Sequence, residues 1–296
     1  MSLVNKTKTA LDESRMLMLG AQILLGFQLQ APFQNAFAVL STIEKWLELG
    51  VLALIVGVVA LLVMPSSFHR IAHDGEASGD IIRLIGRVML VTLTAFALAM
   101  ALDLGLAGMR IGGPSLGVAA GIIGFAICLG IWLAPSLASR EEADMPTSDE
   151  KTPMAAKIDY VLTEARVVLP GAQAFLGFQL AVVLTKAFGE LSQGLKWVHG
   201  LSLTFIVLAT ALLIAPAAYH RIAYGGRDSA DFHRLSSRFL LLATMFLALG
   251  VSCDVYLVTF KIADKALAPW VFSIGTAGLL FGLWHVWPWL VGRRAV

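Results

Sequence analysis

Residues 13–29 read ESRMLMLGAQILLGFQL, and residues 164–180 repeat them as EARVVLPGAQAFLGFQL. When each residue is set beside the residue 151 positions later, the match extends from 13–103 to 164–254 without a gap, and 37 of 91 positions are identical. A second shared stretch, PSSFHRIAHDGEASGDIIRLIGR at 65–87, returns as PAAYHRIAYGGRDSADFHRLSSR at 216–238. The chain is therefore a tandem duplication, and positions kept in both copies can be ranked above the rest.

The composition predicts an all-α integral membrane protein. Of 296 residues, 58% are apolar and 14% are charged, and the mean hydropathy is +0.79. A soluble domain carries about 25% charged residues, so the surplus apolar surface requires a bilayer. A net charge of +2 gives no reason to expect a nucleic-acid partner.

Eight stretches are long enough to cross a membrane, which takes about 20 apolar residues. We expect them at about 16–39, 47–67, 84–107, 115–137, 167–186, 198–218, 238–260 and 270–291. Each repeat holds an even number, so both copies enter from the same side and are parallel. We expect two four-helix bundles about a pseudo-twofold axis along the membrane normal.

The basic residues predict the orientation. Sixteen Lys and Arg fall on the side of the termini and six on the other side, so both termini are expected in the cytoplasm. This fits a plasma membrane, the inner membrane of a bacterium. Trp284, Trp287 and Trp289 are expected in the aromatic belt at the last cytoplasmic boundary.

The predicted domains are a first repeat at 1–137, a charged, Pro-containing cytoplasmic linker at 138–157, and a second repeat at 158–296. The linker composition is typical of a solvated connector.

Buried amides are the first candidate site, because a side-chain amide in hydrocarbon needs partners. The kept glutamines, all expected to point into the bundle, are Gln22, Gln28, Gln173 and Gln179. They would line a polar path for a solute or ion. Alternatively they hydrogen-bond between helices, where Gly26 and Gly177 allow close approach.

Kept carboxylates are the second candidate site. Glu13 and Glu164 fall at cytoplasmic helix ends, where they would admit a proton or cation or would pair with Arg15, Arg87 and their matches. Asp103 and Asp254 fall near the other face. They would form a cation site or would pair with Lys45 and Lys196.

The third candidate is the pair of His-Arg loops. The residues that could bind a lipid headgroup or another anion are His69, Arg70, His220, Arg221, Arg87 and Arg238. Histidine could also act as a pH sensor. Haem or a metal held between His69 and His220 is a further alternative. No ligand motif supports a metal, and no phosphate loop, dinucleotide fingerprint or nucleophile elbow indicates an enzyme.

The stripe ExR, GxQ, PxxxHR and the later Arg resembles a bacterial family of small four-helix membrane proteins of unknown function. Its single-repeat members are often labelled sodium:proton antiporters. The matching positions are Glu13, Arg15, Gly20, Gln22, Pro65, His69, Arg70 and Arg87, with Glu164, Arg166, Gly171, Gln173, Pro216, His220, Arg221 and Arg238 in the second copy. The first copy departs at Gly86, where Ser237 keeps the family's Ser-Arg. The resemblance implies the fold and topology.

Two functions are therefore expected as alternatives. One is a small-solute or cation transporter with a polar path between the repeats. The other is a non-transporting membrane module that binds a lipid headgroup, a partner helix or a cofactor through the His-Arg loops. The expected partners are membrane lipids, a cation or small solute, and a second copy of the chain.

Overall fold

The computed structural model describes residues 2–138, 151–263 and 266–294. Within these residues every regular element is a helix, and eight helical segments are long and apolar enough to cross a membrane. The predicted number of eight spans is therefore confirmed by helix length and composition. The long helices are α1 (Leu3–Gln30), α2 (Thr42–His73), α3 (Gly79–Gly112), α4 (Pro114–Ala138), α5 (Met154–Val183), α7 (Gln193–Ile222) and α8 (Ala230–Ile262).

The last span is interrupted. It consists of α9 (Ala268–Phe281), one π-helical turn (Gly282–Val286) and α10 (Trp287–Arg294). After α1 the chain forms two short 3-10 turns, Ala31–Phe33 and Asn35–Val39, and after α5 it forms the short α6 (Lys186–Gly189). The first span was predicted to run to 39. It ends near Gln30 because Pro32 breaks the helix although the apolar run continues.

Serine side chains begin most of the long helices. Ser41 caps α2 in a capping box with Glu44, and Ser78, Ser192 and Ser229 cap α3, α7 and α8. Ser41 matches Ser192 and Ser78 matches Ser229, so the duplication kept both caps. A serine oxygen caps a helix because it can accept from the free backbone N–H groups of the first turn. The linker was predicted to reach 157, but α5 already begins at Met154. The rest of it, residues 139–150, lies outside the described residues.

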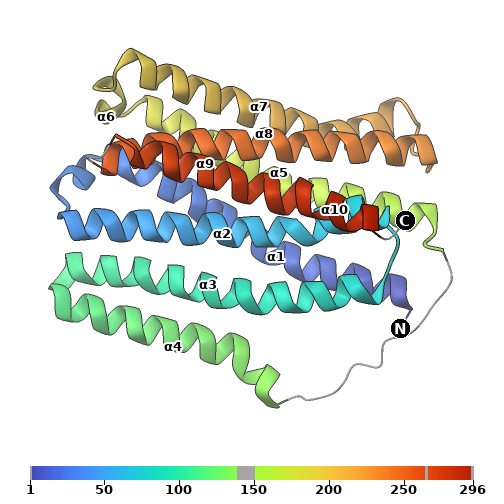
Figure 1. Ribbon diagram of the computed structural model, residues 1–296, viewed down its shortest axis with the longest axis horizontal. Helices are drawn as coiled ribbons and strands as arrows, with labels where there is room; N and C mark the ends of the chain where they lie inside the picture. Colours follow the sequence, from blue (N-terminus) through green and yellow to red (C-terminus); the bar gives the residue numbers. More distant parts are fainter. Residues whose placement is uncertain (1, 139–150, 264–265, 295–296) are drawn as a thin grey trace.

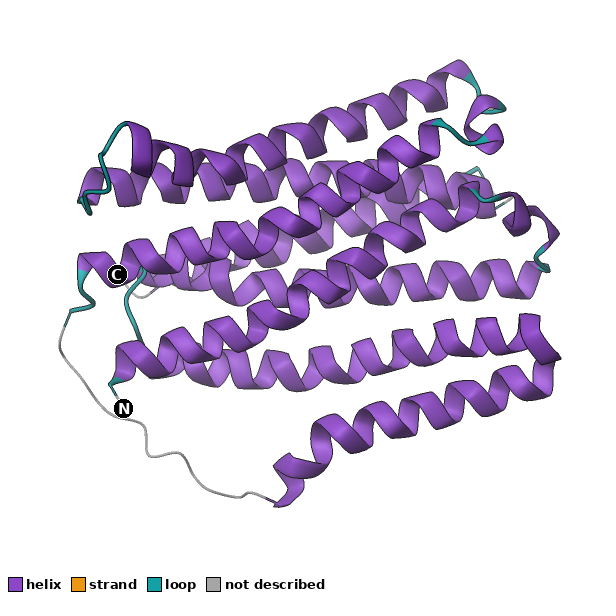
Figure 2. Ribbon diagram, turned by 180° about the vertical axis from the view of Figure 1, so that it is seen from behind, coloured by secondary structure: helices purple, strands orange, loops and turns teal. Residues whose placement is uncertain are grey.

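The helices form one layered bundle with α4 and α7 at its two edges (Figures 1 and 2). The matched first helices α1 and α5 pack against each other, and we call this contact the seam. α2 is central, because it contacts α1, α3, α8 and the last span. Both chain termini lie at the same end of the helices, here called the terminal end.

The matched fourth spans take different places. α4 packs along α3 and has no other extensive helix contact within the described residues, whereas the last span packs on both α8 and α2. Trp284 is fully buried in this second contact and donates its Nε1–H to the Ala60 carbonyl oxygen at 2.9 Å. The prediction that Trp284 lies in an aromatic belt is therefore wrong, because the π-helical turn directs it against α2 rather than toward the headgroups.

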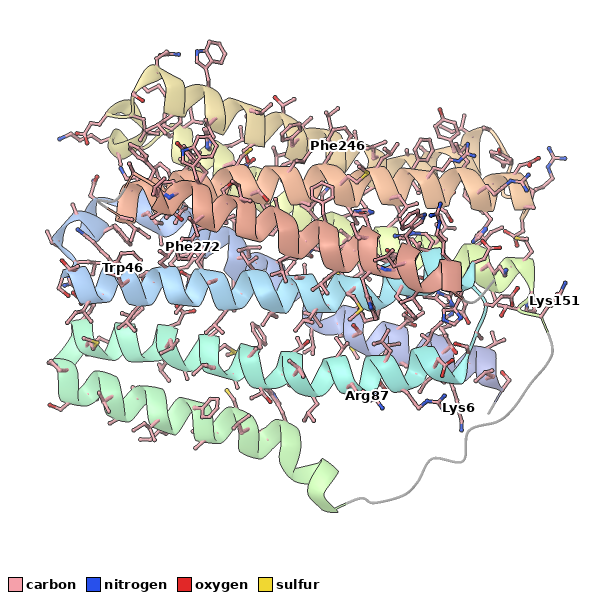
Figure 3. The ribbon with its side chains drawn as sticks, viewed as in Figure 1. Lys6, Trp46, Arg87, Lys151, Phe246 and Phe272 are labelled. Carbon is pink, nitrogen blue, oxygen red and sulfur yellow. The ribbon has the colours of Figure 1, made fainter. Side chains whose placement is uncertain are left out.

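The side chains follow the expected division between a bilayer-facing surface and polar ends. Val118, Ile122 and Ile127 on α4 are exposed, as a lipid-facing helix requires. Figure 3 shows Trp46 at the end opposite the termini, with Lys6, Arg87 and Lys151 toward the terminal end.

Candidate functional site

The seam is tight where glycines face bulky side chains. A Cβ atom added to Gly26 would overlap the Phe178 ring, and a Cβ atom added to Gly171 would overlap the Gln22 amide. Each of these glycines has a matched glycine, Gly177 or Gly20, that faces open space. The helices therefore meet closely, and the two copies contribute unequally.

Near the terminal end, a buried ion pair joins the copies. Arg70 of α2 donates from Nη1 to Glu164 Oε2 of α5 at 2.7 Å, and each side chain is only 5% exposed. Beside this pair, the His69 ring meets the Tyr160 ring edge-on at 5.1 Å. Since a buried charge is tolerated better when it is paired, each residue compensates part of the cost of burying the other, while Arg70 Nε and Nη2 and Glu164 Oε1 have no hydrogen-bond partner among the described residues.

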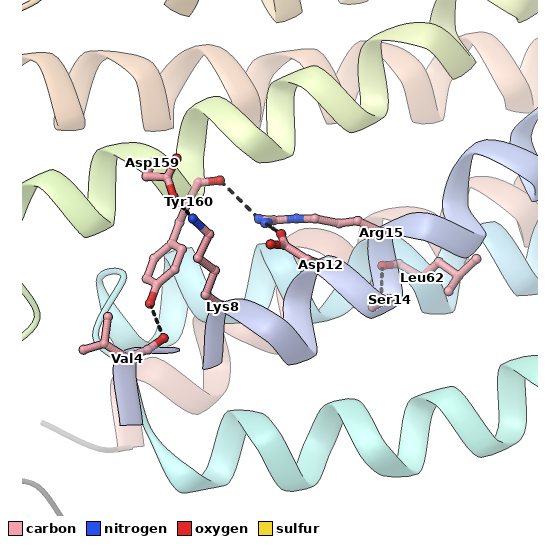
Figure 4. Close-up of polar contacts among 8 residues, drawn as sticks. All are labelled: Val4, Lys8, Asp12, Ser14, Arg15, Leu62, Asp159 and Tyr160. Carbon is pink, nitrogen blue, oxygen red and sulfur yellow. Dashed lines mark hydrogen bonds and ion pairs between the residues drawn. The ribbon is translucent and has the colours of Figure 1, made fainter. Parts of the chain in front are cut away.

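A second group of polar contacts continues along the seam (Figure 4). Arg15 donates to Asp12 Oδ1 at 3.0 Å and to the Tyr160 carbonyl oxygen at 3.1 Å. Lys8 pairs with Asp159 at 2.6 Å, and the Tyr160 hydroxyl donates to the Val4 carbonyl oxygen at 2.9 Å. These contacts hold the first turns of α1 against those of α5.

A third contact ties the start of the second copy to the loop after α2. Lys157 is largely buried and contacts Glu76 Oε1 at 2.7 Å and the Asp74 carbonyl oxygen at 2.8 Å. The Thr152 N–H also donates to Glu76 at 2.8 Å. Burial of Glu76 opposes its ionisation, but the hydrogen bonds from Lys157 and Thr152 outweigh that cost and lower the pKa of Glu76.

The matched residues of this cluster are placed differently. Glu13, Arg166 and Arg221 are exposed, although Glu164, Arg15 and Arg70 are buried. Glu13 and Glu164 therefore do not form two equivalent ion entries. Arg87 and Arg238 are both exposed, away from the buried pair.

The two kept histidines have different surroundings. His69 is buried against Tyr160, whereas His220 is partly exposed, 3.5 Å from Asp228 Oδ1 and packed on the Phe232 ring. Among the residues that the structure describes, no three His, Cys, Asp or Glu side chains are grouped to hold a metal ion.

A second polar layer lies toward the other end of the helices. Gln179 Nε2 donates to Asp254 at 2.6 Å and to the Ser202 hydroxyl at 2.7 Å, and Ser202 donates to the Gly250 carbonyl oxygen. In the first copy, Gln28 Nε2 donates to Asp103 at 2.7 Å. Lys45 and Lys196 were considered as partners of the aspartates. The kept amides occupy that role instead, because they reach the carboxylates from the first helix of each copy.

Sequence comparison missed two residues of this layer. Glu48 and His199 occupy matched positions. Glu48 lies near enough to Asp103 for their charges to interact, and His199 and Asp254 both contact Gln179. The His199 Nε2 lies 3.1 Å from the Gln179 carbonyl oxygen, and Glu48 has a buried oxygen, Oε2, with no hydrogen-bond partner among the described residues. A search for identical residues passes over them because one is acidic and the other basic.

Gln22 lies between the two layers. It is fully buried, and neither amide atom has a hydrogen-bond partner among the described residues. Along α1 it is about 10 Å from both Arg15 and Gln28, at 1.5 Å per residue. Its match, Gln173, is exposed, so the expectation that all four glutamines point inward is wrong for Gln173. The seam carries this polar group on one side only.

A small pocket lies at the second polar layer of the seam. Gly26, Phe33, Gln179, His199 and Asp254 contribute to its wall, and it encloses about 10 Å³. This is roughly the space that one water molecule needs. The pocket is therefore too small for a solute larger than water.

A family model supports the duplication. The model described as "Family of unknown function (DUF6328)" matches residues 5–136 and again residues 149–288. The chain belongs to this family. Its two matches coincide with the two copies read from the sequence. No curated protein and no solved structure matches the chain.

Proposed function

We propose that this protein is a proton-coupled carrier of a small ion or solute, with its path along the seam between α1 and α5. Gln22 carries the proposal: a fully buried amide without partners is costly in an apolar protein interior. Such a group is retained where a ligand passes. Its position between two buried polar layers supports a path that runs from one end of the helices to the other.

In this proposal, the ionisable groups of the second polar layer form the site that couples proton binding to transport. Asp254 and His199 lie in the second copy, and Asp103 and Glu48 in the first. Two carboxylates brought together in a low-dielectric medium, as in the first copy, favour binding of one shared proton over two negative charges. The aspartate and histidine of the second copy instead offer two groups that can each bind a proton. Asp254 is buried and accepts a hydrogen bond from the Gln179 amide, which supports a carboxylate inside the bundle as part of this site.

The proposed arrangement in the membrane follows from the duplication. Lys8 and Asp159 are 151 residues apart and touch each other, and two matched residues come into contact only close to an axis that relates the copies. This supports a pseudo-twofold axis along the seam, parallel to the membrane normal. The basic residues at the terminal end support cytoplasmic termini in a bacterial inner membrane.

The test uses everted membrane vesicles with a pH gradient followed by a fluorescent dye. Addition of sodium, potassium or anion salts should collapse the gradient in vesicles that contain the wild type. Gln22→Leu should abolish this response, because the path loses its central polar group. Gln173→Leu, the matched change at an exposed position, should retain it. A wild type that is folded and correctly oriented but gives no response to any salt would exclude the proposed function.

A pocket at the terminal end favours a second function, binding of an anionic lipid headgroup. It encloses about 220 Å³ and is lined by Phe68, Asp80, Arg83, Arg87 and Trp287. Phe68 and Trp287 stack at 4.8 Å, so an apolar wall lies beside two guanidinium groups. Such a combination suits a headgroup phosphate and the start of its acyl chains.

Native mass spectrometry of protein purified with phosphatidylglycerol tests this second function. Arg87→Gln should reduce the number of retained lipids, whereas Arg238→Gln, at the matched exposed position, should leave it unchanged. Equal retention by both variants would argue against the pocket.

A further inference from the structure

A larger pocket lies at the end of the seam opposite the termini. The 3-10 turns after α1, the start of α2, the short α6 and the end of α8 meet there, and they enclose about 590 Å³. This is a usual size for a small-molecule site. The polar and charged residues that line it are Gln34, Asn35, Lys45, Lys186, Glu190 and Lys261.

The pocket has an excess of positive charge. Three lysines line it against one carboxylate, that of Glu190, which lies 3.8 Å from Lys186. Within the described residues Lys45 and Lys261 make no ion pair. Unpaired ammonium groups that converge on a concave surface raise the local concentration of anions.

The position of these lysines is unusual for the chain. Only six of its 22 Lys and Arg residues fall on this side of the predicted spans, and the positive-inside rule gives no reason for a cluster of them here. Three of the six nevertheless line one pocket. Membrane topology therefore does not explain them, whereas a ligand would.

The matched basic residues are used differently. Lys196, the match of Lys45, donates to the Gly189 carbonyl oxygen at 2.9 Å. Arg110, the match of Lys261, lies 3.9 Å from Glu44. Neither lines the pocket. Of these two matched pairs of cations, Lys196 and Arg110 contact other protein atoms, whereas Lys45 and Lys261 line the pocket.

Phe33 connects this pocket with the interior of the seam. Lys261 Nζ lies 5.3 Å from the centre of the Phe33 ring, in a cation–π contact. The same ring, which is almost fully buried, contributes to the wall of the small enclosed pocket next to Asp254 and His199. The Phe33 ring therefore contacts a lysine of the larger pocket and the wall of the small pocket in the second polar layer.

We infer that the lysine pocket binds a small anion that carries a phosphate or carboxylate group. The ammonium groups of Lys45, Lys186 and Lys261 neutralise its charge, and the amides of Gln34 and Asn35 are available as further hydrogen-bond donors. The inference goes beyond the proposed function and does not rest on it, because binding here is an equilibrium property that needs no transport.

Isothermal titration calorimetry with the full chain in phosphatidylcholine nanodiscs tests the inference, with inorganic phosphate and succinate as probes. The wild type should bind at least one probe saturably, and more weakly as salt is added. Lys45→Gln/Lys261→Gln should weaken binding at least tenfold. The matched double variant, Lys196→Gln/Arg110→Gln, should change it less than twofold. Melting curves of all three proteins establish that they are folded.

Repeating the titration in phosphatidylglycerol nanodiscs identifies the source of the anion. Loss of probe binding by the wild type in these discs would assign the pocket to a lipid phosphate, and unchanged binding would assign it to a free anion. Both results support the lysine pocket as an anion site. Absence of saturable binding by the wild type in phosphatidylcholine, or equal affinity in the pocket variant, would overturn it.

Discussion

The same ion pair could form twice in this molecule, but only one copy is present. Arg70 of the first repeat is buried against Glu164 of the second, whereas their matches, Arg221 and Glu13, are both exposed. The residues are identical, so the difference comes from their neighbours. The last span covers α2, which carries Arg70, and α4 does not cover α7, which carries Arg221. Identity between repeats therefore preserves a residue without preserving its environment.

The largest expected effect comes from breaking the buried pair. Arg70→Met should destabilise the protein by about 3–5 kcal/mol, because it leaves the Glu164 carboxylate buried without a partner. Arg221→Met, at the matched exposed position, should cost less than about 0.5 kcal/mol. Thermal unfolding in detergent measures both.

The double variant Arg70→Met/Glu164→Leu sharpens this test. It removes both charges together and should recover much of the loss, since no unpaired charge remains. If Arg70→Met and Arg221→Met lose the same stability, burial of the Arg70–Glu164 pair does not determine how much it contributes to the free energy of unfolding.

An intermediate effect is expected at the seam glycines. Gly171→Ala should cost about 1–3 kcal/mol, because the new methyl group overlaps the buried Gln22 side chain. Gly20→Ala, the matched change, meets open space and should be neutral or stabilising through the higher helix propensity of alanine. Melting temperatures of the two variants, measured side by side, test the comparison. A destabilising Gly20→Ala would show that the copies pack more equally than described.

The smallest effect concerns pH. The pKa of Glu76 is lowered in the folded protein, so its contacts with Lys157 and Thr152 stabilise the fold above the unfolded pKa, about 4.3. This contribution is lost as the pH falls through the lower folded value. Because Glu76 is partly exposed, it should amount to less than about 1 kcal/mol.

Melting temperatures between pH 7 and pH 3 measure this contribution. Glu76→Gln should be less stable than the wild type at pH 7, and the difference in stability between the two proteins should shrink toward pH 3. Arg227 occupies the matched position, and Arg227→Gln should leave the pH dependence unchanged. If Glu76→Gln loses as much stability between pH 7 and pH 3 as the wild type does, the loss must come from other carboxylates.

The sequence predicts the number of spans and the duplication because hydrophobic length and identity are local signals. It predicts boundaries less well: Pro32 ends the first helix inside an apolar run, and α5 begins within the charged linker. It also cannot predict that Trp284 is buried, because that depends on which neighbouring helix covers the last span.

The candidate site was predicted in part. Gln28 and Gln179 pair with the kept aspartates Asp103 and Asp254, a pairing that was not predicted from the sequence, whereas Gln22 and Gln173 do not within the described residues. The burial of Gln22 and the exposure of Gln173 could not be predicted, because both follow the same Gly-Ala pair and their burial depends on which helix covers each of them. One difference in the sequence could have indicated that the two copies differ at their loops. Residue 76 is Glu and its match, residue 227, is Arg, so the two loops cannot make the same contact with a matched lysine.

The contact between Trp284 and α2 has a consequence for biosynthesis. More than 200 residues separate Ala60 from Trp284, so at 5–20 residues per second the ribosome needs about 10–40 s to supply the covering helix. During that interval the first repeat is already in the bilayer, and the face of α2 that will receive Trp284 is in contact with lipid or with the insertion machinery. The first half of the chain therefore completes its packing only when the last helix has been inserted.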